Sequence, residues 1–311
     1  MRRTGLRSYD ALIATRDETV DQILDHVLAP ELGTARAAGG SASSGDLLLT
    51  IMGEFLLPHD GWAWTQTVIG LLDQLGVRDK AARQALARMR DRGWLGTERV
   101  GRQTRWRLTD HATSVLDAGA DRIYGFGRPT RAWDGTWLLL LASVSEPDRH
   151  LRYRMNTGLS WAGFGSIGPG MWLSPWVAQE SVAVELLAEL DVDGTTFHGA
   201  LGELGSAADL AARAWDLPAV RATYDEFVVA SDALVAGRYR GARAAAELTL
   251  LVHRWRHVPF FDPDLPAAVL PADWPGFFAA RRFAELREML LPEARAWWRD
   301  RQAEFTPAQE S

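Results

Sequence analysis

Residues 78–107, RDKAARQALARMRDRGWLGTERVGRQTRWR, form the stretch that decides the fold of this chain. The stretch carries ten Arg or Lys residues and three acids, Asp79, Asp91 and Glu98, and so has a net charge of +7. The whole chain of 311 residues has a net charge of −6. A basic island of this size in an acidic protein indicates a surface that meets a polyanion.

The first half of the stretch predicts an amphipathic helix over residues 78–92, closed by Gly93. At 100° per residue, one face is an apolar stripe of Ala82, Ala85, Leu86 and Met89. The opposite face carries Lys80, Arg83, Gln84, Ala87, Arg88 and Asp91. Gln pairs with adenine, Arg pairs with guanine, and a small residue between them permits close approach to a base edge. An ordinary solvated helix has a similar charged face, so the helix alone leaves both interpretations open.

The second half predicts two strands, residues 94–99 and 103–108, around the turn Val100-Gly101-Arg102. Upstream, residues 46–57 predict a first helix with Asp46 as its N-cap, and residues 65–75 predict a second helix that ends at Gly76. Three helices followed by a hairpin is the order of a winged helix-turn-helix. Such a domain places a positive helix and a positive hairpin against DNA.

The predicted DNA-binding residues all lie on the third helix and on the hairpin. They are Arg78, Lys80, Arg83, Gln84, Arg88, Arg99, Arg102 and Arg105. We expect Arg83, Gln84 and Arg88 to read bases, and the other residues mostly to hold phosphates.

The composition favours a globular protein, because 47% of the residues are hydrophobic and 14 are Trp. There is no Cys, which excludes disulfides, thiolate metal sites and a catalytic cysteine. The longest apolar run, residues 137–144, is far shorter than the roughly 20 residues of a membrane span. No apolar segment of the secretory type follows the N-terminal arginines. We expect a cytoplasmic protein that has no membrane partner.

The segments on either side of the predicted DNA-binding domain carry weaker signals. Residues 1–45 are expected to be a partly disordered extension, with a helix near residues 19–28 and a Gly/Ser/Ala linker at 37–45. An alternative is a basic arm, Arg2, Arg3 and Arg7, that enters a minor groove. Residues 111–134 are expected to be a linker.

Residues 135–196 alternate between strand and helix, as a small ferredoxin-like layer does. A strand is expected within residues 136–146, a helix at 148–161, a short strand within 162–176 and a helix at 177–190. The glycines at 163–170 lack the order of a phosphate loop and indicate turns.

From residue 197 to 305 the chain is expected to be mostly helical, which makes the protein α+β. Helices are expected at 210–217, 224–234, 242–257 and 277–301. Residues 259–276 contain too many prolines for one helix and are expected to form ordered turns. The apolar side chains expected to anchor these turns are Phe260, Phe261, Leu265, Val269, Leu270 and Trp274.

Neither a catalytic site, nor a metal site, nor a cofactor is expected. His253 and His257 have the i,i+4 spacing of two metal ligands, but no Glu follows His253 to act as a base. No GxSxG motif is present, which argues against Ser-His-Asp catalysis. Asp262 and Asp264 lie in the Pro-rich segment, where carboxylates more often cap turns.

Several stretches together resemble the phenylacetate-degradation repressors, the PaaX-like family of transcriptional regulators. The matching stretches are LLLTIMGEFLLPHDGWAWTQTVIGLL, GVRDKAARQALARMRDRGWLGTERVGRQTRWRLT, WDGTWLLLL, GFGSIGPGMWLSP, ARAWDL and LLVHRWRHVPFFDPDLPAAVLPADWPG. They occur in the family's order and cover residues 46 to about 300, so the resemblance is more specific than any single motif.

The resemblance implies three parts. These are a winged helix-turn-helix (46–110), a central ferredoxin-like domain similar to the Cas2-like endoribonuclease fold (135–196), and a helical C-terminal domain for dimerisation and effector binding (197–305). It also implies a homodimer on a palindromic DNA operator, released by an aryl-acetyl-CoA thioester, typically phenylacetyl-CoA. Two features depart from the family pattern. The extension at 1–45 is not part of it, and the strand WLLLLASV lacks the Asp of nuclease-like relatives, so nuclease activity is not expected.

A CoA thioester needs cationic groups for its phosphates and an apolar slot for its acyl group. Two clusters supply candidates: Arg149, Arg152 and Arg154 in the central domain, and Arg254 and Arg256 beside Trp255. Four alternatives stay open. The protein could be an activator, a regulator that responds to another acyl-CoA, a CoA-thioester enzyme with an inherited DNA-binding domain, or a scaffold for an acidic protein.

Overall fold

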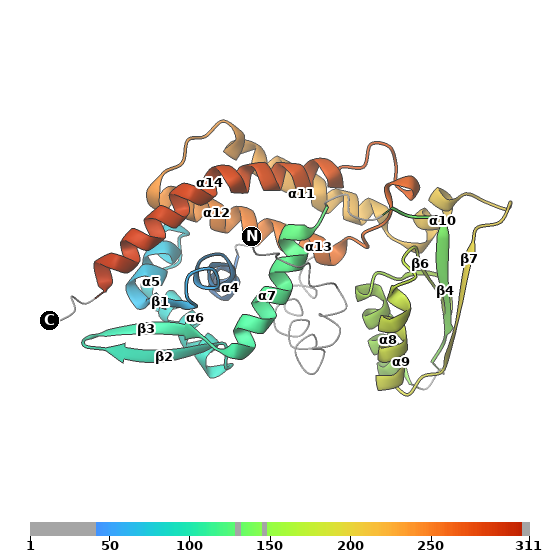
Figure 1. The fold of residues 1–311 in the computed structure, drawn as a ribbon, viewed down its shortest axis with the longest axis horizontal. Coiled ribbons are helices and arrows are strands. Elements are labelled where there is room, and N and C mark those ends of the chain that lie inside the picture. Colours follow the sequence, from blue (N-terminus) through green and yellow to red (C-terminus); the bar gives the residue numbers. More distant parts are fainter. Residues whose placement is uncertain (1–41, 128–131, 145–147, 307–311) are drawn as a thin grey trace, which may run out of the picture. The chain divides into compact units, whose positions relative to one another are not determined.

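The computed structural model describes residues 42–127, 132–144 and 148–306 (Figure 1). The expectations for the N-terminal helix and for a basic arm at Arg2, Arg3 and Arg7 therefore lie outside the described residues. The chain divides into two compact units. Among the described residues, the first unit comprises residues 42–125, 231–255 and 283–306, and the second comprises residues 126–127, 132–144, 148–230 and 256–282.

The first unit begins with helix α4 (Ser44–Ile51), which continues as a π-helical turn, η2 (Met52–Leu56). Ser43 is the N-cap of α4, because its backbone is extended and its hydroxyl accepts a hydrogen bond from the Asp46 amide at 3.2 Å. The prediction that Asp46 is the N-cap was therefore wrong by three residues. The apolar side chains of α4 and η2, among them Leu48, Ile51 and Phe55, are fully buried.

The predicted second and third helices and the hairpin are confirmed to within about a residue. They are α5 (Thr65–Gln74), α6 (Asp79–Asp91), β2 (Leu95–Val100) and β3 (Gln103–Leu108). Gly76 and Gly93 follow the two helices with φ of +79° and +76°, which only glycine adopts easily. A short strand that the sequence did not indicate, β1 (Trp62–Trp64), pairs antiparallel with β3, so the sheet order is β1-β3-β2.

Three further helices pack onto this core. Residues 111–134, expected to be a linker, begin as helix α7 (Asp110–Gly125), with Ala112 and Val115 buried. Helix α12 (Gly241–Trp255) contacts α4 and α5. Helix α14 (Gly276–Phe305) adds Trp298, which stacks on Phe55 with ring centroids 4.9 Å apart. Helix α12 and most of α14 belong to the first unit, where they cover apolar side chains of α4 and η2 that α5 and α6 leave uncovered. The helical domain expected at 197–305 is therefore divided between the two units.

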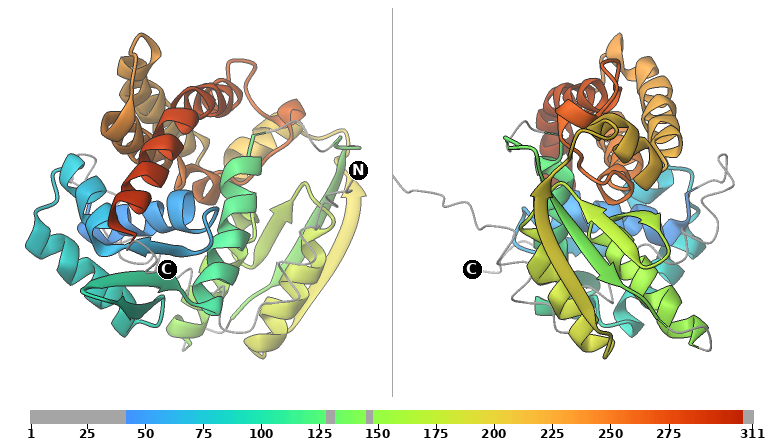
Figure 2. Two further views of the ribbon diagram at one scale, coloured as in Figure 1. Left: turned by 60° about the vertical axis from the view of Figure 1, so that its left-hand side comes forward. Right: turned by 90° about the vertical axis from the view of Figure 1, so that its right-hand side faces the viewer.

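The second unit contains a four-stranded antiparallel sheet of order β5-β6-β4-β7. Its elements in chain order are β4 (Thr136–Ala142), α8 (Arg149–Trp161), β5 (Gly165–Gly168), β6 (Met171–Ser174), α9 (Gln179–Glu189) and β7 (Gly194–Ala200). Helices α8 and α9 lie on the same face of the sheet (Figure 2). Leu138, Leu140 and Ala142 of β4 are buried beneath them. The predicted alternation is confirmed, except that residues 162–176 form two strands instead of one.

The remaining segments of the second unit are helices and turns. Helix α10 (Ala207–Ala214) and helix α11 (Leu217–Val235) are separated at Trp215, which packs so closely on Gly165 that a Cβ there would lie 2.5 Å from the indole. The Pro-rich segment forms α13 (Val258–Phe261) and the 3-10 turn η3 (Ala267–Val269), as ordered turns were predicted. Leu265, Val269 and Trp274 are buried and Leu270 is half-buried, whereas Phe261 is 39% exposed and does not anchor the segment. The Phe260 side chain is not among those that the structure describes.

Candidate nucleic-acid interface

Helix α6 buries one face and exposes the other, as its sequence predicts. Ala82, Ala85, Leu86 and Met89 are between 0% and 8% exposed. Lys80, Arg83, Gln84 and Arg88 are exposed, and Ala87 between them is half-buried. The chain therefore holds α6 by its apolar stripe and leaves its amide and its cations for a partner.

The exposed cations of α6 differ in the hydrogen bonds and ion pairs that they form within the protein. Arg83 donates from Nε and Nη2 to the Asp79 carboxylate at 2.8 Å and 3.1 Å, and this hydrogen bonding raises the pKa of Arg83. Arg88 makes a long contact of 3.4 Å with the Ser44 hydroxyl. Within the described residues, the side chains of Gln84 and Lys80 have neither a hydrogen bond nor an ion pair. Gln84 and Lys80 are thus the polar side chains of this face that are already exposed and have no partner to give up among the described residues.

Three arginines of the β2–β3 hairpin differ in the partners that their side chains bind. Arg102 follows Gly101 at the turn, is exposed, and has no hydrogen-bonding or ionic partner in the part of the chain that the structure describes. Arg99 donates to the Gly101 carbonyl at 3.3 Å. Arg105 donates two hydrogen bonds of 2.8 Å to Glu98, its cross-strand neighbour, and lies 5.2 Å from the Trp62 ring centroid. Among the residues that the structure describes, Arg102 is therefore the arginine of the turn whose side chain has no partner.

The structure adds Arg107 to this surface, a residue that the sequence prediction left out. Trp106 and Leu108 are buried, so the alternation of β3 turns Arg105 and Arg107 to the opposite side. The Arg107 side chain is exposed and has no hydrogen bond or ion pair among the described residues. This alternation was readable in the sequence once residues 103–108 had been assigned to a strand.

The C-terminal end of α14 fixes the sheet from its β1 edge (Figure 1). The side-chain amide of Gln302 accepts from the Trp64 backbone at 3.0 Å and donates to the Trp62 carbonyl at 3.2 Å. The Trp64 indole donates to the Thr306 hydroxyl at 3.2 Å. A side chain thus satisfies the edge of β1 as a neighbouring strand would.

A buried ion pair ties η2, α7 and α14 together behind the interface. The Glu54 side chain is 0% exposed and accepts hydrogen bonds from Arg287 at 2.8 Å and from the Tyr124 hydroxyl at 2.6 Å. The Arg287 guanidinium also lies 4.3 Å from the Tyr124 ring centroid. Burial and, secondly, the Glu54 charge raise the pKa of the Tyr124 phenol well above its usual range. Both oxygens of the buried carboxylate are thereby satisfied.

The two predicted effector clusters differ in accessibility. On α8, Arg149 and Arg154 are exposed and Arg152 is half-buried. In the other cluster Trp255 is 0% exposed, donates to the Ile123 carbonyl at 2.9 Å and stacks on Phe283 at 4.8 Å. Arg254 is exposed and Arg256 is buried. Trp255 therefore belongs to the core of the first unit and offers no surface to a ligand.

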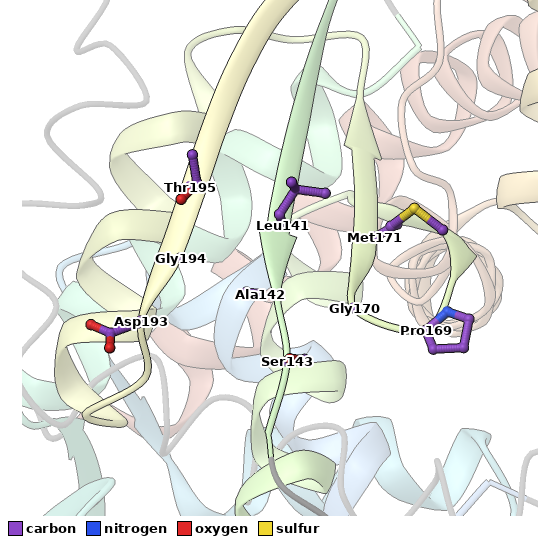
Figure 3. Close-up of a pocket in the computed structure, with 9 residues that line it drawn as sticks. All are labelled: Leu141, Ala142, Ser143, Pro169, Gly170, Met171, Asp193, Gly194 and Thr195. Atoms are coloured by element: carbon purple, nitrogen blue, oxygen red, sulfur yellow. The ribbon is translucent and has the colours of Figure 1, made fainter.

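An open hollow of about 440 Å³ lies at one end of the sheet in the second unit (Figure 3). Its lining includes Leu141, Ser143, Met171, Asp193 and Thr195. Asp193 is the charged member of this lining, and a carboxylate repels the phosphates of a CoA ester. The residues that line the hollow therefore supply no cation for the phosphates of a CoA ester.

The other polar groups that the sequence raised have structural roles. Helix α12 ends at Trp255, so His257 lies beyond the helix that carries His253. Asp262 accepts from the Asp264 amide at 2.7 Å, as a turn-capping carboxylate does, and also from the Tyr224 hydroxyl. Burial and, secondly, the Asp262 charge raise the pKa of that phenol far above its usual range. Among the residues that the structure describes, no three His, Cys, Asp or Glu side chains are grouped as a metal site requires.

Comparison with known proteins matches three successive parts of the chain to models of one protein family. The family models described as PaaX-like protein, PaaX protein central Cas2-like domain and PaaX-like protein C-terminal domain match residues 42–112, 130–211 and 215–300. The transcriptional repressor PaaX of Escherichia coli (strain K12) is 31% identical over 267 residues, which are 82% of this chain and 83% of that protein. This chain belongs to the PaaX-like family.

The resemblance predicted from the sequence is therefore confirmed. The PaaX-like fold is mixed α/β, with an N-terminal, a central Cas2-like and a C-terminal part. A solved structure of an uncharacterized protein from Mycobacterium tuberculosis shares the fold, with a TM-score of 0.57 and 24% identity over 82% of this chain and 98% of that chain. The family and its named relative indicate a transcriptional repressor and not an enzyme. No helix in the described part of the chain is long and apolar enough to span a membrane.

Proposed function

We propose that this PaaX-like protein is a winged helix-turn-helix repressor that binds a palindromic double-stranded DNA operator as a homodimer. An aryl-acetyl-CoA thioester, with phenylacetyl-CoA as the first candidate, would release it and so switch on a catabolic operon for aromatic acids. The observation that carries the proposal is the exposed face of α6, with Gln84 and Arg88 next to a basic hairpin. The name of the Escherichia coli relative supports the sign of regulation.

The two domain assignments rest on the order of the elements. Helices α5 and α6, followed by the hairpin β2–β3, have the order of a helix-turn-helix and its wing, with α6 as the recognition helix. In the second unit the chain order β-α-β-β-α-β and the sheet order β5-β6-β4-β7 are those of a ferredoxin-like domain. The match to a central Cas2-like family model supports the second assignment.

On DNA, α6 would enter the major groove with Arg83, Gln84 and Arg88 toward the bases. Arg78 and Lys80 at its N-terminal end, and Arg99, Arg102 and Arg105 of the hairpin, would contact phosphates. Arg83 would exchange the Asp79 carboxylate for a base edge or a phosphate. The exchange is easy, because an exposed i,i+4 ion pair contributes only about 0.3–0.5 kcal/mol.

Replacing Glu98 with Gln is expected to tighten DNA binding roughly 5- to 10-fold near 0.1 M salt. Glu98 holds Arg105 with two hydrogen bonds and cancels its charge, so replacing Glu98 adds one net positive charge to the hairpin where it meets the phosphates. The plot of log affinity against log salt should steepen by about 0.9. Fluorescence anisotropy between 50 and 300 mM salt measures both quantities (about six concentrations suffice). Glu203→Gln, an exposed acid of the second unit, is the control, and equal slopes in the two variants would exclude Arg105 from the interface.

The effector would bind its phosphates at the α8 cluster, because Arg149 and Arg154 are exposed there while Trp255 of the other cluster is in the core. The double variant Arg149→Ala/Arg154→Ala should raise the phenylacetyl-CoA concentration for half-release by about 10-fold or more. Its affinity for DNA without effector should stay unchanged. Release from preformed complexes measures this, with Arg213→Ala as the control for an exposed arginine of the same unit. A wild-type response in the double variant would exclude the α8 cluster as the phosphate site.

The class of effector is tested by adding phenylacetyl-CoA, acetyl-CoA and free CoA to preformed complexes of the protein with the DNA upstream of its own gene. The proposal predicts release by phenylacetyl-CoA at concentrations at which acetyl-CoA and CoA leave the complex intact. Equal release by all three would assign the response to the CoA phosphates alone. No release by any of them would remove the thioester from the proposal and keep the DNA binding.

A further inference from the structure

Strand β1 is the short edge strand of the first unit's sheet and lies next to the strand that carries two of the hairpin's arginines. In the order β1-β3-β2 it pairs with β3 on one side, and no described strand pairs with its other side. Trp62 lies opposite Arg107 in this pairing, and Trp64 lies opposite Arg105. Directly paired residues share a face of a sheet, so the two tryptophans lie on the same face as the two arginines. The position of β1 therefore affects the surface that these arginines form.

The Arg105 side chain is held from two sides. Glu98 accepts two hydrogen bonds of 2.8 Å from the guanidinium, whose Cζ lies 5.2 Å from the Trp62 ring centroid. A guanidinium within about 6 Å of an indole ring is attracted to it. On DNA, a phosphate would compete with Glu98 for the guanidinium. The Trp62 ring is then the contact within the protein that still orients Arg105.

The end of α14 closes the outer edge of β1 with one side chain. The Gln302 amide accepts from the Trp64 backbone N–H at 3.0 Å and donates to the Trp62 carbonyl at 3.2 Å. A strand of three residues makes few hydrogen bonds to its neighbour, so the two bonds from Gln302 are a substantial addition. The Trp64 indole adds a bond to the Thr306 hydroxyl at 3.2 Å. Gln302 therefore fixes the backbone that carries the Trp62 ring.

Gln302 is itself held in place, because contacts fix the chain about one turn before it and one turn after it. Trp298, on the same face of α14, is 0% exposed and stacks on Phe55 with ring centroids 4.9 Å apart. The Thr306 hydroxyl donates to the Gln302 carbonyl at 2.8 Å and accepts from the Trp64 indole. Little side-chain freedom is left to lose when the Gln302 amide bonds β1.

We propose that Gln302 is a positioning residue for DNA binding, which places Arg105 through β1 and the Trp62 ring. This role rests on the proposed function, since a DNA phosphate is there the ligand of Arg105. Gln302 has no charge and needs no contact with DNA. Its loss should therefore remove only affinity that Arg105 supplies, on operator and random DNA alike.

The first test is a double-mutant cycle with Gln302→Met, which removes both hydrogen bonds and leaves an unbranched, uncharged side chain. Near 0.1 M salt, Gln302→Met should weaken binding to both DNAs roughly 3- to 5-fold, and Arg105→Ala at least roughly 5-fold. Added to Arg105→Ala, Gln302→Met should cost less than about 1.5-fold more, because no cation is left to position. Gln74→Met, at an exposed glutamine of α5, is the control and should bind as the wild type does. Fluorescence anisotropy measures all of these affinities.

The second test measures the hold on β1 without DNA, by amide hydrogen exchange. The Trp64 N–H bonds to Gln302, so Gln302→Met should speed its exchange at least roughly 10-fold. The amides of α6 should exchange as in the wild type, which also shows that the variant is folded. Thr306→Val, which removes the acceptor of the Trp64 indole, is a milder variant and should show a smaller loss of affinity with the same dependence on Arg105.

Each part of the proposal has a result that would overturn it. Unchanged exchange of the Trp64 amide would show that Gln302 does not hold β1. Wild-type affinity of Gln302→Met, or an equal loss with and without Arg105, would show that Gln302 does not act through Arg105. These results contradict only the role of Gln302 if the wild type binds DNA. A wild type that binds neither DNA would contradict the proposed function as well.

Discussion

Replacing Arg287 with Ala is expected to lower the free energy of unfolding of the first unit by about 3–5 kcal/mol. The Glu54 carboxylate that Arg287 neutralises is 0% exposed, so the variant leaves a charge in the core whose hydrogen-bond partner among the described residues is the Tyr124 hydroxyl. The guanidinium also covers the Tyr124 ring at 4.3 Å, and this contact is lost as well. The ion pair joins residues that are 233 positions apart, so its loss loosens α14 from η2.

Urea unfolding, followed by tryptophan fluorescence, measures this loss. Arg299→Ala is the matched control, since Arg299 is an exposed arginine of the same helix, and its effect should be below about 0.5 kcal/mol. The double variant Glu54→Gln/Arg287→Met should recover much of the stability, because no buried charge remains. Similar losses in Arg287→Ala and Arg299→Ala would show that the Glu54 charge is solvated in solution.

Replacing Gln84 with Ala is expected to weaken operator binding by about 1–3 kcal/mol, or roughly 5- to 150-fold, with little effect on random DNA. Gln84 lies at the centre of the exposed face of α6 and has no competing partner among the described residues. Loss of a bidentate contact to one base should also relax the sequence preference at that base pair.

Replacing Arg102 with Ala should have a different signature. Arg102 lies at the hairpin turn, where we expect it to contact phosphate and not a base edge, so operator and random DNA should weaken by similar factors. The salt slope should fall by about 0.9. Anisotropy titrations of both variants on both DNAs at several salt concentrations separate the two roles, with Gln74→Ala on α5 as the control for an exposed glutamine. Equal losses on both DNAs for Gln84→Ala would remove it from base reading.

The local elements of the interface were predictable because local signals define them. Gly76 and Gly93 end α5 and α6, and the apolar stripe of α6 gives its orientation. Strand β1 was not predictable in this way. It has three residues, pairs with a strand about 40 positions later, and is completed by Gln302 from the end of the chain. Such pairings depend on tertiary contacts that no local pattern reports.

The sequence also could not show which partners the charged side chains bind, or whether a given aromatic side chain is buried. The net charge of the island is a sum, and it does not show that Asp79 engages Arg83 and Glu98 engages Arg105. Trp255, between two arginines, resembled a ligand-binding side chain. Its spacing with Leu248, Leu251 and Val252 along α12 instead places it on the buried face of that helix. The helical period was the better guide there, since it determines which face packs.

The most direct test of the account is an anisotropy titration of the DNA upstream of this protein's gene, against a shuffled DNA of the same length, at 0.15 M salt (about physiological). An operator-binding repressor should show nanomolar affinity for the upstream DNA, at least about 10³-fold weaker affinity for the shuffled DNA, and loss of the specific complex on addition of phenylacetyl-CoA. Equal micromolar affinity for both DNAs would contradict base reading by α6, and with it the assignment of this protein as an operator-binding repressor.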